Sequence, residues 1–364
     1  MPLDDLKKRE RNADAFIRDL RQRSSAARAH GRRPAPIGGQ DARMITDSLR
    51  VRLGMKRRRY KTMAQRVALK AKLRNASDDR PRRPVFVLGC PRSGTSLVYT
   101  LLQRHPELRS LGGEGHVLWN AYQHPRLKGW SSDRALASDI HDEEPRFLYS
   151  AINAVAGPHR FLEKTPKNIL RVPYLNALFP DARYVLLKRD GRAVVNSLIE
   201  GWGVRQSPVY RLPEPLRLRD YRGRLWCFIL PPDWRAYAET SIADVAAFQF
   251  ASSYDVGLAD VKALPSASVV ELRFEALLER PLEEMARVLE ALELPPSVEI
   301  DEMAGDLVSN VVQSNSPPRP DKWRQREDVI NEVMPRFEHT MTALGYGDAV
   351  DVDRSAAPAP NQTL

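Results

Sequence analysis

The sequence lacks the features that mark secreted and membrane proteins. Its 364 residues include two cysteines, Cys90 and Cys227, which are too few for a disulfide framework. It has no apolar run of about 20 residues, the length that a membrane-spanning helix needs. The N-terminal stretch MPLDDLKKRERNADAF contains acidic residues and no apolar segment of a signal peptide. We therefore expect a soluble protein in a reducing compartment, with a cytoplasmic location.

Acidic residues are scarce in the first quarter of the chain. Residues 1–83 contain 25 Lys and Arg against 9 Asp and Glu, whereas the remainder contains 32 basic and 37 acidic residues. The change occurs near residues 75–83, where NASDDRPRRP has the composition of a linker. We predict a basic helical extension and linker over 1–83, a folded domain over 84–348 and a disordered tail over 349–364.

The basic extension has two candidate helices, over about residues 3–30 and 41–72. One hypothesis is that they pack on the domain and present a solvated basic face. The other is that they contact an anionic surface or a partner subunit. No motif for specific nucleic-acid binding is present.

From Pro84 onward, short apolar strands alternate with amphipathic helices, which is typical of an α/β fold with a parallel sheet. The expected strands are Val85–Leu88, Leu108–Leu111, Arg160–Leu162, Arg183–Leu187 and Ser268–Arg273. The expected helices are Thr95–Arg104, Asn168–Phe179, Arg192–Trp202, Ile242–Leu264, Leu282–Leu292 and about Glu327–Leu344. Ligands of such sheets bind beyond the carboxyl ends of the strands. The span Gln206–Glu239, rich in proline and tryptophan, is predicted to be an irregular insertion that acts as a lid and selects the acceptor.

The stretch VFVLGCPRSGTSLVYTLL, residues 85–102, nearly matches the phosphate-binding pattern G-x-x-x-x-G-K-[ST] but lacks its lysine. Gly89 and Gly94 have the required spacing, and Thr95 occupies the lysine position. A strand, a glycine-rich turn and a helix in this order present backbone N–H groups to an anion. Arg92 inside the loop supplies a permanent, bidentate cation. The pattern therefore favours an anion without magnesium over a triphosphate.

A second stretch, EKTPKNILRVPYLNALFPDARYVLLKRDGRAVVNSLIEGW, spans residues 163–202. Arg189 comes at the end of a predicted strand, and Ser197 lies on the helix that follows. These two side chains are placed to share a second phosphate. Alternatively, Arg189 pairs only with Asp190.

Together the two stretches resemble the sulfotransferases that use 3′-phosphoadenosine 5′-phosphosulfate (PAPS). PRSGTS is similar to their 5′-phosphosulfate loop and RDGRAVVNS to their 3′-phosphate motif, and the resemblance covers about residues 84–345. It implies a three-layer, P-loop nucleoside-kinase-like α/β sandwich with a central parallel sheet, PAPS as co-substrate and no metal. The donor-binding residues that it implies in the loop are Pro91, Arg92, Ser93, Gly94, Thr95 and Ser96, together with Arg189 and Ser197.

The resemblance also implies catalytic groups. One branch of the family uses a histidine in a K-[ST]-H motif, but the corresponding KTPK segment here has none. The tyrosylprotein branch uses a glutamate in a GEE segment and a lysine in a K-D-P segment. Glu114, in HPELRSLGGEGHVLW, is placed similarly to the glutamate with one extra residue in the segment, and Lys164 in EKTP matches the lysine. We expect Glu114 to be the base, with Lys164 and Arg92 stabilising the transferred and leaving groups. The alternatives are that Glu114 only pairs with an arginine, that His116 is the base, and that Lys164 is a surface lysine.

Near the C-terminus, DKWRQ resembles the late K-W segment of the family. It makes Lys322 a candidate phosphate contact and Trp323 a candidate wall of the site. The alternative is a lysine at the rim beside a core tryptophan. Related sequences often have L-R-Y-E-D-L where this chain has LRFEALL, so Phe274 lacks the tyrosine hydroxyl.

The predicted function is transfer of a sulfuryl group from PAPS to a hydroxyl of a small-molecule, carbohydrate or lipid acceptor. Three alternatives stay open: a P-loop kinase or other phosphotransferase, a protein-tyrosine sulfotransferase, and a non-catalytic nucleotide-binding protein. Acidic peptide acceptors are less expected, because the chain from residue 84 onward carries a net negative charge.

Overall fold

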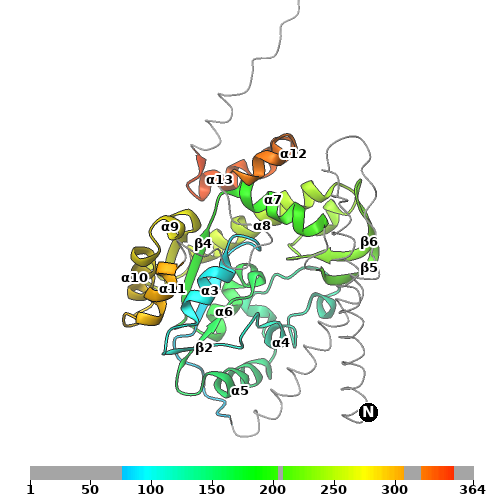
Figure 1. The fold of residues 1–364 in the computed structure, drawn as a ribbon. Coiled ribbons are helices and arrows are strands. Elements are labelled where there is room, and N and C mark those ends of the chain that lie inside the picture. Colours follow the sequence, from blue (N-terminus) through cyan, green and yellow to red (C-terminus); the bar gives the residue numbers. More distant parts are fainter. Residues whose placement is uncertain (1–75, 204–207, 307–320, 348–364) are drawn as a thin grey trace, which may run out of the picture. The chain divides into compact units, whose positions relative to one another are not determined.

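A computed structural model describes residues 76–203, 208–306 and 321–347 (Figure 1). The helices expected over 3–30 and 41–72 and the tail expected over 349–364 lie outside the described residues. All structural statements below concern the described part of the chain.

The centre of the fold is a five-stranded sheet in which every neighbouring pair of strands is parallel, in the order β2-β3-β1-β4-β7. Its strands are β1 (Val85–Leu88), β2 (Leu108–Arg109), β3 (Arg160–Glu163), β4 (Arg183–Lys188) and β7 (Val269–Arg273). β1 is wholly buried, as a strand covered on both faces of a parallel sheet must be. The predicted α/β class and parallel sheet are confirmed.

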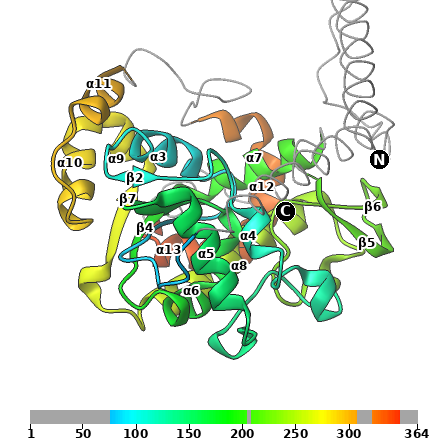
Figure 2. The same cartoon turned by 90° about the horizontal axis from the view of Figure 1, so that it is seen from below.

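Helices cover both faces of this sheet and make a three-layer sandwich (Figures 1 and 2). Successive residues of β1 face opposite ways: Phe86 and Leu88 enter one core cluster, and Val85 and Val87 enter the other. The first cluster contains side chains of α4 (His116–Trp119), α5 (Glu144–Ala156), α6 (Val172–Leu178), α7 (Gly191–Gly203), α8 (Ile242–Val261), α12 (Glu327–Val333) and α13 (Glu338–Ala343). The second contains those of α3 (Thr95–Leu102), α9 (Phe274–Glu279), α10 (Pro281–Ala291) and α11 (Val298–Asp306).

Two expected helices are interrupted, in each case near a proline. The span 168–179 divides into a 3-10 turn, η4 (Pro166–Leu170), and α6, with Pro173 in the first turn of α6. The span 327–344 divides into α12, a 3-10 turn at Met334–Arg336 and α13, with Pro335 in that turn. Proline has no N–H to donate and fits only the first turn of a helix.

The expectation of an irregular insertion over 206–239 is wrong for much of that span. β5 (Pro208–Arg217) and β6 (Arg222–Cys227) form an antiparallel hairpin with register shifts between Arg211 and Leu216. Three prolines of β5 argued against a strand, but proline is tolerated at the edges of a two-stranded ribbon. A further 3-10 turn, Trp234–Tyr237, follows the hairpin.

The carboxyl ends of the parallel strands carry most of the candidate site residues. The glycine-rich loop follows β1, Lys164 follows β3, and Arg189 follows β4. Parallel strands end at the same edge of a sheet, so residues far apart in sequence meet there. No helix in the described ranges is long and apolar enough to cross a membrane.

Gly257→Ala should destabilise the domain because it overfills the contact between α8 and η4. An added Cβ at Gly257 would lie 2.5 Å from Cγ1 of the buried Ile169. Overpacking of this kind costs about 1–3 kcal/mol, more than the ~1 kcal/mol that alanine gains over glycine in a helix. Urea unfolding gives the free energy of unfolding. Gly305→Ala on α11 is the matched control, because nothing lies within 4 Å of its added Cβ. Equal stability of the two variants would contradict this account of the contact.

Candidate active site

The glycine-rich loop between β1 and α3 leaves the N-terminus of α3 open. Ser93 closes the turn, with its backbone N–H and its hydroxyl both donating to the carbonyl of Cys90, at 3.1 and 2.7 Å. Gly94, the residue before α3, has φ +104° and supplies no side-chain cap, and the first turn has no acidic residue. Uncapped N–H groups and the positive end of the helix dipole favour an anion at this position.

Phe274 fits against the loop and explains why residue 94 must be glycine. A Cβ at Gly94 would lie 2.4 Å from the Phe274 ring, and the φ of Gly94 is itself unfavourable for other residues. On the same ring lies the guanidinium of Arg189, with its Cζ 4.2 Å from the ring centroid. Phe274 is 5% exposed. Without a hydroxyl, this residue contributes packing for the loop and a cation–π contact for Arg189.

Arg92, Arg189 and Ser197 lie together at the loop. Arg92 Nε donates to Ser197 Oγ on α7 at 3.0 Å, and Arg189 Nη1 donates to the Arg92 carbonyl at 3.1 Å. Arg92 has φ +75°, a strained conformation that its neighbours hold in place. The alternative partner of Arg189, Asp190, instead forms an ion pair with Arg192 at 2.8 Å.

Burial lowers the pKa of both Arg92 and Arg189, and the charge of Arg92 lowers the pKa of Arg189 further. Glu200 opposes the shift of Arg92, whereas Glu275 and Asp190 oppose that of Arg189. Both guanidinium groups are therefore partly desolvated at the loop. An anion bound there would relieve this cost.

The ammonium of Lys164 bonds both to helix α3 and to Glu114. Its Nζ lies 3.2 Å from Ser96 Oγ in the first turn of α3 and 2.8 Å from Glu114 Oε1. The side chain is 6% exposed, so the hypothesis that Lys164 is a surface lysine is wrong. Glu114 Oε2 lies 2.8 Å from His116 Nε2, and no arginine is among these partners. The described structure thus brings Glu114, His116 and Lys164 together.

Electrostatics keep Glu114 ionised. Burial alone would raise the pKa of Glu114, but the hydrogen bonds and charges of His116 and Lys164 outweigh it and hold the pKa well below its usual range. Burial also lowers the pKa of His116, and the charges of Lys167 and Arg171 lower it further, against the opposing effect of Glu114. At neutral pH the pair is a carboxylate and a neutral imidazole.

Glu163, which the sequence analysis missed, fixes the position of this pair. Its buried carboxylate accepts hydrogen bonds from the Gly115 N–H at 2.9 Å and from Thr165 Oγ1 and Asn168 Nδ2, both at 2.5 Å. Gly115 lies between Glu114 and His116, and a Cβ there would be 2.7 Å from Glu163 Oε1. The loop carrying the pair is therefore attached to the end of β3. The conspicuous signal was EKTP itself, an acidic residue directly after an apolar strand.

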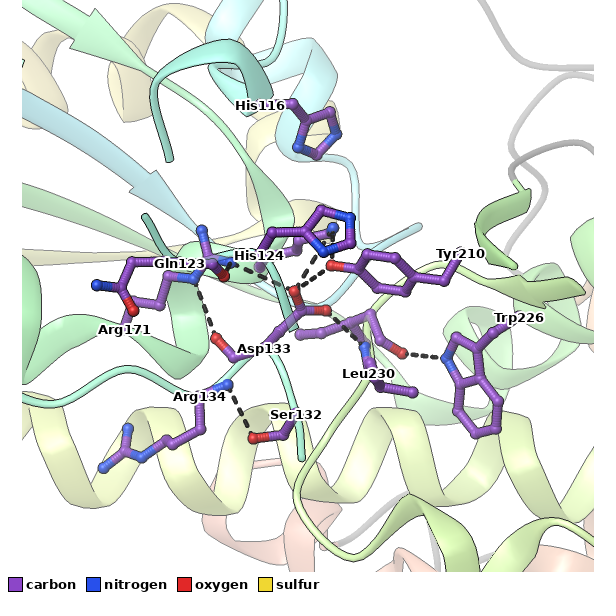
Figure 3. Close-up of polar contacts among 12 residues, drawn as sticks. His116, Gln123, His124, Ser132, Asp133, Arg134, Arg171, Tyr210, Trp226 and Leu230 are labelled. Atoms are coloured by element: carbon purple, nitrogen blue, oxygen red, sulfur yellow. Dashed lines mark hydrogen bonds and ion pairs between the residues drawn. The ribbon is translucent and has the colours of Figure 1, made fainter. Parts of the chain in front are cut away.

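A second buried carboxylate, Asp133, lies beside the site and was also missed (Figure 3). Asp133 accepts hydrogen bonds from the Tyr210 hydroxyl and, at 2.8 Å, from the Leu230 N–H. It forms ion pairs with Lys167 at 3.5 Å and with Arg171 at 3.3 Å. The ammonium of Lys167 donates to the Tyr210 hydroxyl and lies 4.0 Å from the centroid of its ring. This network attaches the β5–β6 hairpin to η4 and to the loop around Asp133.

Lys322 and Trp323 lie on η7 (Lys322–Arg326), which packs against α7. Lys322 Nζ is 2.7 Å from Glu200 Oε2, one helical turn from Ser197. Trp323 is 3% exposed and belongs to the core, with the guanidinium of Arg192 4.5 Å from its ring centroid. Lys322 thus contacts α7 one turn after Ser197, and Trp323 packs in the core.

Cys90 and Cys227 are both buried. Among the described side chains, no group of three or more His, Cys, Asp or Glu residues is arranged to hold a metal ion.

Lys167→Met should abolish an increase of the free energy of unfolding with pH that we expect in the wild type. Burial lowers the pKa of Lys167 to about 8, although Asp133 opposes the shift, whereas an unfolded lysine titrates near pH ~10.4. Between these values the unfolded chain binds the additional proton, so the free energy of unfolding increases with pH, by about 1–3 kcal/mol in all. Urea unfolding across this interval measures the difference between wild type and variant. Lys262→Met, at an exposed position, is the control; parallel curves for wild type and Lys167→Met would refute the prediction.

The chain is similar in sequence to known proteins. The model of the family described as "Sulfotransferase family" matches residues 84–298, more than half of the 364-residue chain. Nodulation protein NoeE of Sinorhizobium fredii is 28% identical over 233 residues, which are 58% of this chain and 50% of the relative. Human protein-tyrosine sulfotransferase 1 is 33% identical over 124 residues, 32% of this chain and 33% of the relative.

Solved sulfotransferase structures are also similar, at low identity. STF9 from Mycobacterium avium has a TM-score of 0.47 and 17% identity over 73% of this chain and 78% of that one. Mouse SULT7A1 in complex with PAP has a TM-score of 0.44 and 12% identity over 79% and 94% of the two chains. The chain spans half or less of the length of the curated relatives named here. On the evidence of the match over residues 84–298, the protein belongs to the sulfotransferase family.

Proposed function

We propose that the protein transfers the sulfuryl group of PAPS to a hydroxyl of an acceptor. The observation that carries the proposal is the position of the Lys164 ammonium, bonded both to Ser96 at the start of α3 and to Glu114. One buried cation therefore connects an anion-binding helix terminus with a carboxylate–imidazole pair. Sulfuryl transfer to an alcohol needs these two elements side by side.

The residues present fit a donor with two separated anionic groups. The open N-terminus of α3, with the loop residues Pro91, Arg92, Ser93, Gly94, Thr95 and Ser96, would hold the 5′-phosphosulfate. Arg189, Ser197 and Lys322 would hold the 3′-phosphate. The donor supplies an activated sulfuryl group with a phosphate as leaving group. Thr95, which is 3% exposed, occupies the lysine position of the triphosphate pattern. A kinase is therefore a weaker candidate, because it would lack this lysine.

The roles of the remaining groups follow from their charge. Lys164, which donates to Ser96, and Arg92, inside the loop, would stabilise negative charge on the sulfuryl oxygens and the leaving phosphate. Removal of the acceptor proton is assigned to the pair formed by Glu114 and His116.

For the acceptor we propose a small-molecule, carbohydrate or lipid alcohol. A tyrosine side chain of a protein is a second candidate, because curated relatives such as the human protein are named protein-tyrosine sulfotransferases. The test is PAPS-dependent transfer to a panel containing a phenol, an acidic tyrosine peptide, an oligosaccharide and an aliphatic alcohol. Transfer to the peptide alone would replace the first candidate by the second.

Arg189→Ala should weaken binding of PAP, the desulfated donor, about 10- to 100-fold. The variant would lose the charge-assisted hydrogen bond from Arg189 to the 3′-phosphate. It would also lose the contact of Arg189 with the Arg92 carbonyl. Isothermal titration calorimetry measures the affinity, with ATP–Mg as competitor. Arg287→Ala is the control, because Arg287 lies on α10 and pairs with Glu284 at 2.7 Å. Tight ATP–Mg binding without any response to PAP would instead support a phosphotransferase.

Lys164→Ala should lower kcat about 10²–10³-fold, the usual effect of removing a preorganised cation from a developing charge. Lys164→Met, which keeps the apolar bulk, should lower kcat by the same amount, while thermal unfolding of both variants stays close to wild type. Lys262→Ala, at the exposed end of α8, serves as the control. Undiminished turnover in either Lys164 variant would remove this residue from the mechanism.

A further inference from the structure

Both oxygens of the Glu114 carboxylate are already engaged. Oε1 accepts from Lys164 Nζ and Oε2 from His116 Nε2, each at 2.8 Å. These contacts hold the pKa of Glu114 well below its usual range. A carboxylate held in this way stays ionised but has little tendency to accept a further proton.

The imidazole of His116 has the complementary arrangement. An ionised carboxylate is only an acceptor, so the nitrogen facing it, Nε2, must carry a hydrogen. In the neutral ring the other nitrogen, Nδ1, then has a free lone pair. Nδ1 is buried and has no hydrogen-bond partner in the described ranges, while the side chain as a whole is 31% exposed. A buried acceptor atom without a donor needs an explanation, and an incoming hydroxyl would provide that donor.

The charges around His116 favour this neutral form. Glu114 on the preceding loop raises the pKa of the imidazole, whereas burial and the charges of Lys167 on η4 and Arg171 after it lower it. A second proton on Nδ1 in the resting protein would be a buried donor without an acceptor. It would also lie in the field of these two cations.

We propose that His116 Nδ1 takes the proton of the acceptor hydroxyl, and that Glu114 orients the imidazole and stabilises its charge. In this step the acceptor O–H bond breaks and its proton goes to Nδ1. The acceptor oxygen forms a bond to sulfur as the bond between sulfur and the 5′-phosphate oxygen of PAPS breaks, releasing PAP. The imidazolium formed then loses its proton to solvent. The inference rests on the proposed sulfotransferase function and assigns the base within it.

The variant His116→Gln distinguishes His116 from Glu114 as the base. The glutamine amide still donates to Glu114 but cannot take a proton at neutral pH. If His116 is the base, kcat should fall about 10²–10⁴-fold with whichever acceptor of the panel is used, with the affinity for PAP unchanged. The matched control is His339→Gln, since His339 forms an exposed ion pair with Asp255 at 3.0 Å. Turnover of His116→Gln within threefold of wild type would overturn the proposal.

The pH dependence gives a readout that a structural role would not produce. The wild-type kcat/KM should decline as the pH falls through the pKa of His116, which lies below its usual 6.5. Glu114→Gln should keep this acidic decline but move it to lower pH, because the charge that raises the pKa of His116 is gone. With Glu114 as the base, the wild-type profile would instead stay flat through this range, and Glu114→Gln would lose more activity than His116→Gln.

A measurement without any acceptor completes the test. Long-range ¹H–¹⁵N NMR of the ¹⁵N-labelled full chain, assigned with His116→Gln, reports the protonation of each imidazole nitrogen. We expect His116 at pH 7 as the neutral form with its hydrogen on Nε2. An imidazolium, or a hydrogen on Nδ1, would refute the inference while leaving the proposed function intact. Absence of PAP binding and of PAPS turnover in the wild type would refute the proposed function itself.

Discussion

The arrangement of the site depends on one buried carboxylate, Glu163, at the end of β3. Its partners are the Gly115 N–H, Thr165 and Asn168, and no cation is among these hydrogen bonds. Burial raises the pKa of Glu163, and the hydrogen bonds oppose that effect. Because Gly115 separates Glu114 from His116, this carboxylate holds the segment in which Glu114 contacts both Lys164 and His116. Loss of the carboxylate would remove the acceptor of the buried Thr165 hydroxyl and Asn168 amide. It would also leave the Gly115 N–H with Thr165 Oγ1 alone, and so weaken the attachment of the loop to the sheet.

Asp133, beside the site, also holds several segments together, but its partners include charged side chains. Lys167 and Arg171 compensate its charge, and the Leu230 N–H and the Tyr210 hydroxyl complete its hydrogen bonds. The two cations also act on His116, whose pKa they lower. The network that attaches the hairpin therefore also sets the protonation of the imidazole. A buried ion pair of this kind contributes little net stability but fixes the geometry of the segments that it joins.

The parts of the structure that follow from local pattern could be predicted from the sequence. The strand, loop and helix around Gly89–Gly94 could be predicted because apolar runs and glycine spacing determine them locally. The contacts of Glu163 with Gly115 and of Asp133 with Leu230 join residues 48 and 97 positions apart, and no local pattern encodes them. The hairpin was missed because its prolines obscured the alternation. Helix α5 was missed although its buried Leu148, Ala151 and Ile152 recur at helical spacing.

The absent loop lysine explains how the cations of the site are distributed. A triphosphate loop concentrates its charge on one lysine after the second glycine. Here the cations come from the ends of three different strands: Arg92 after β1, Lys164 after β3 and Arg189 after β4. Arg189 supports the strained Arg92 through its carbonyl, and Phe274 supports both Arg189 and Gly94. Charge spread in this way suits two anionic groups held apart better than a chain of three phosphates. It also lets the Lys164 ammonium bond to Glu114, which in turn contacts His116.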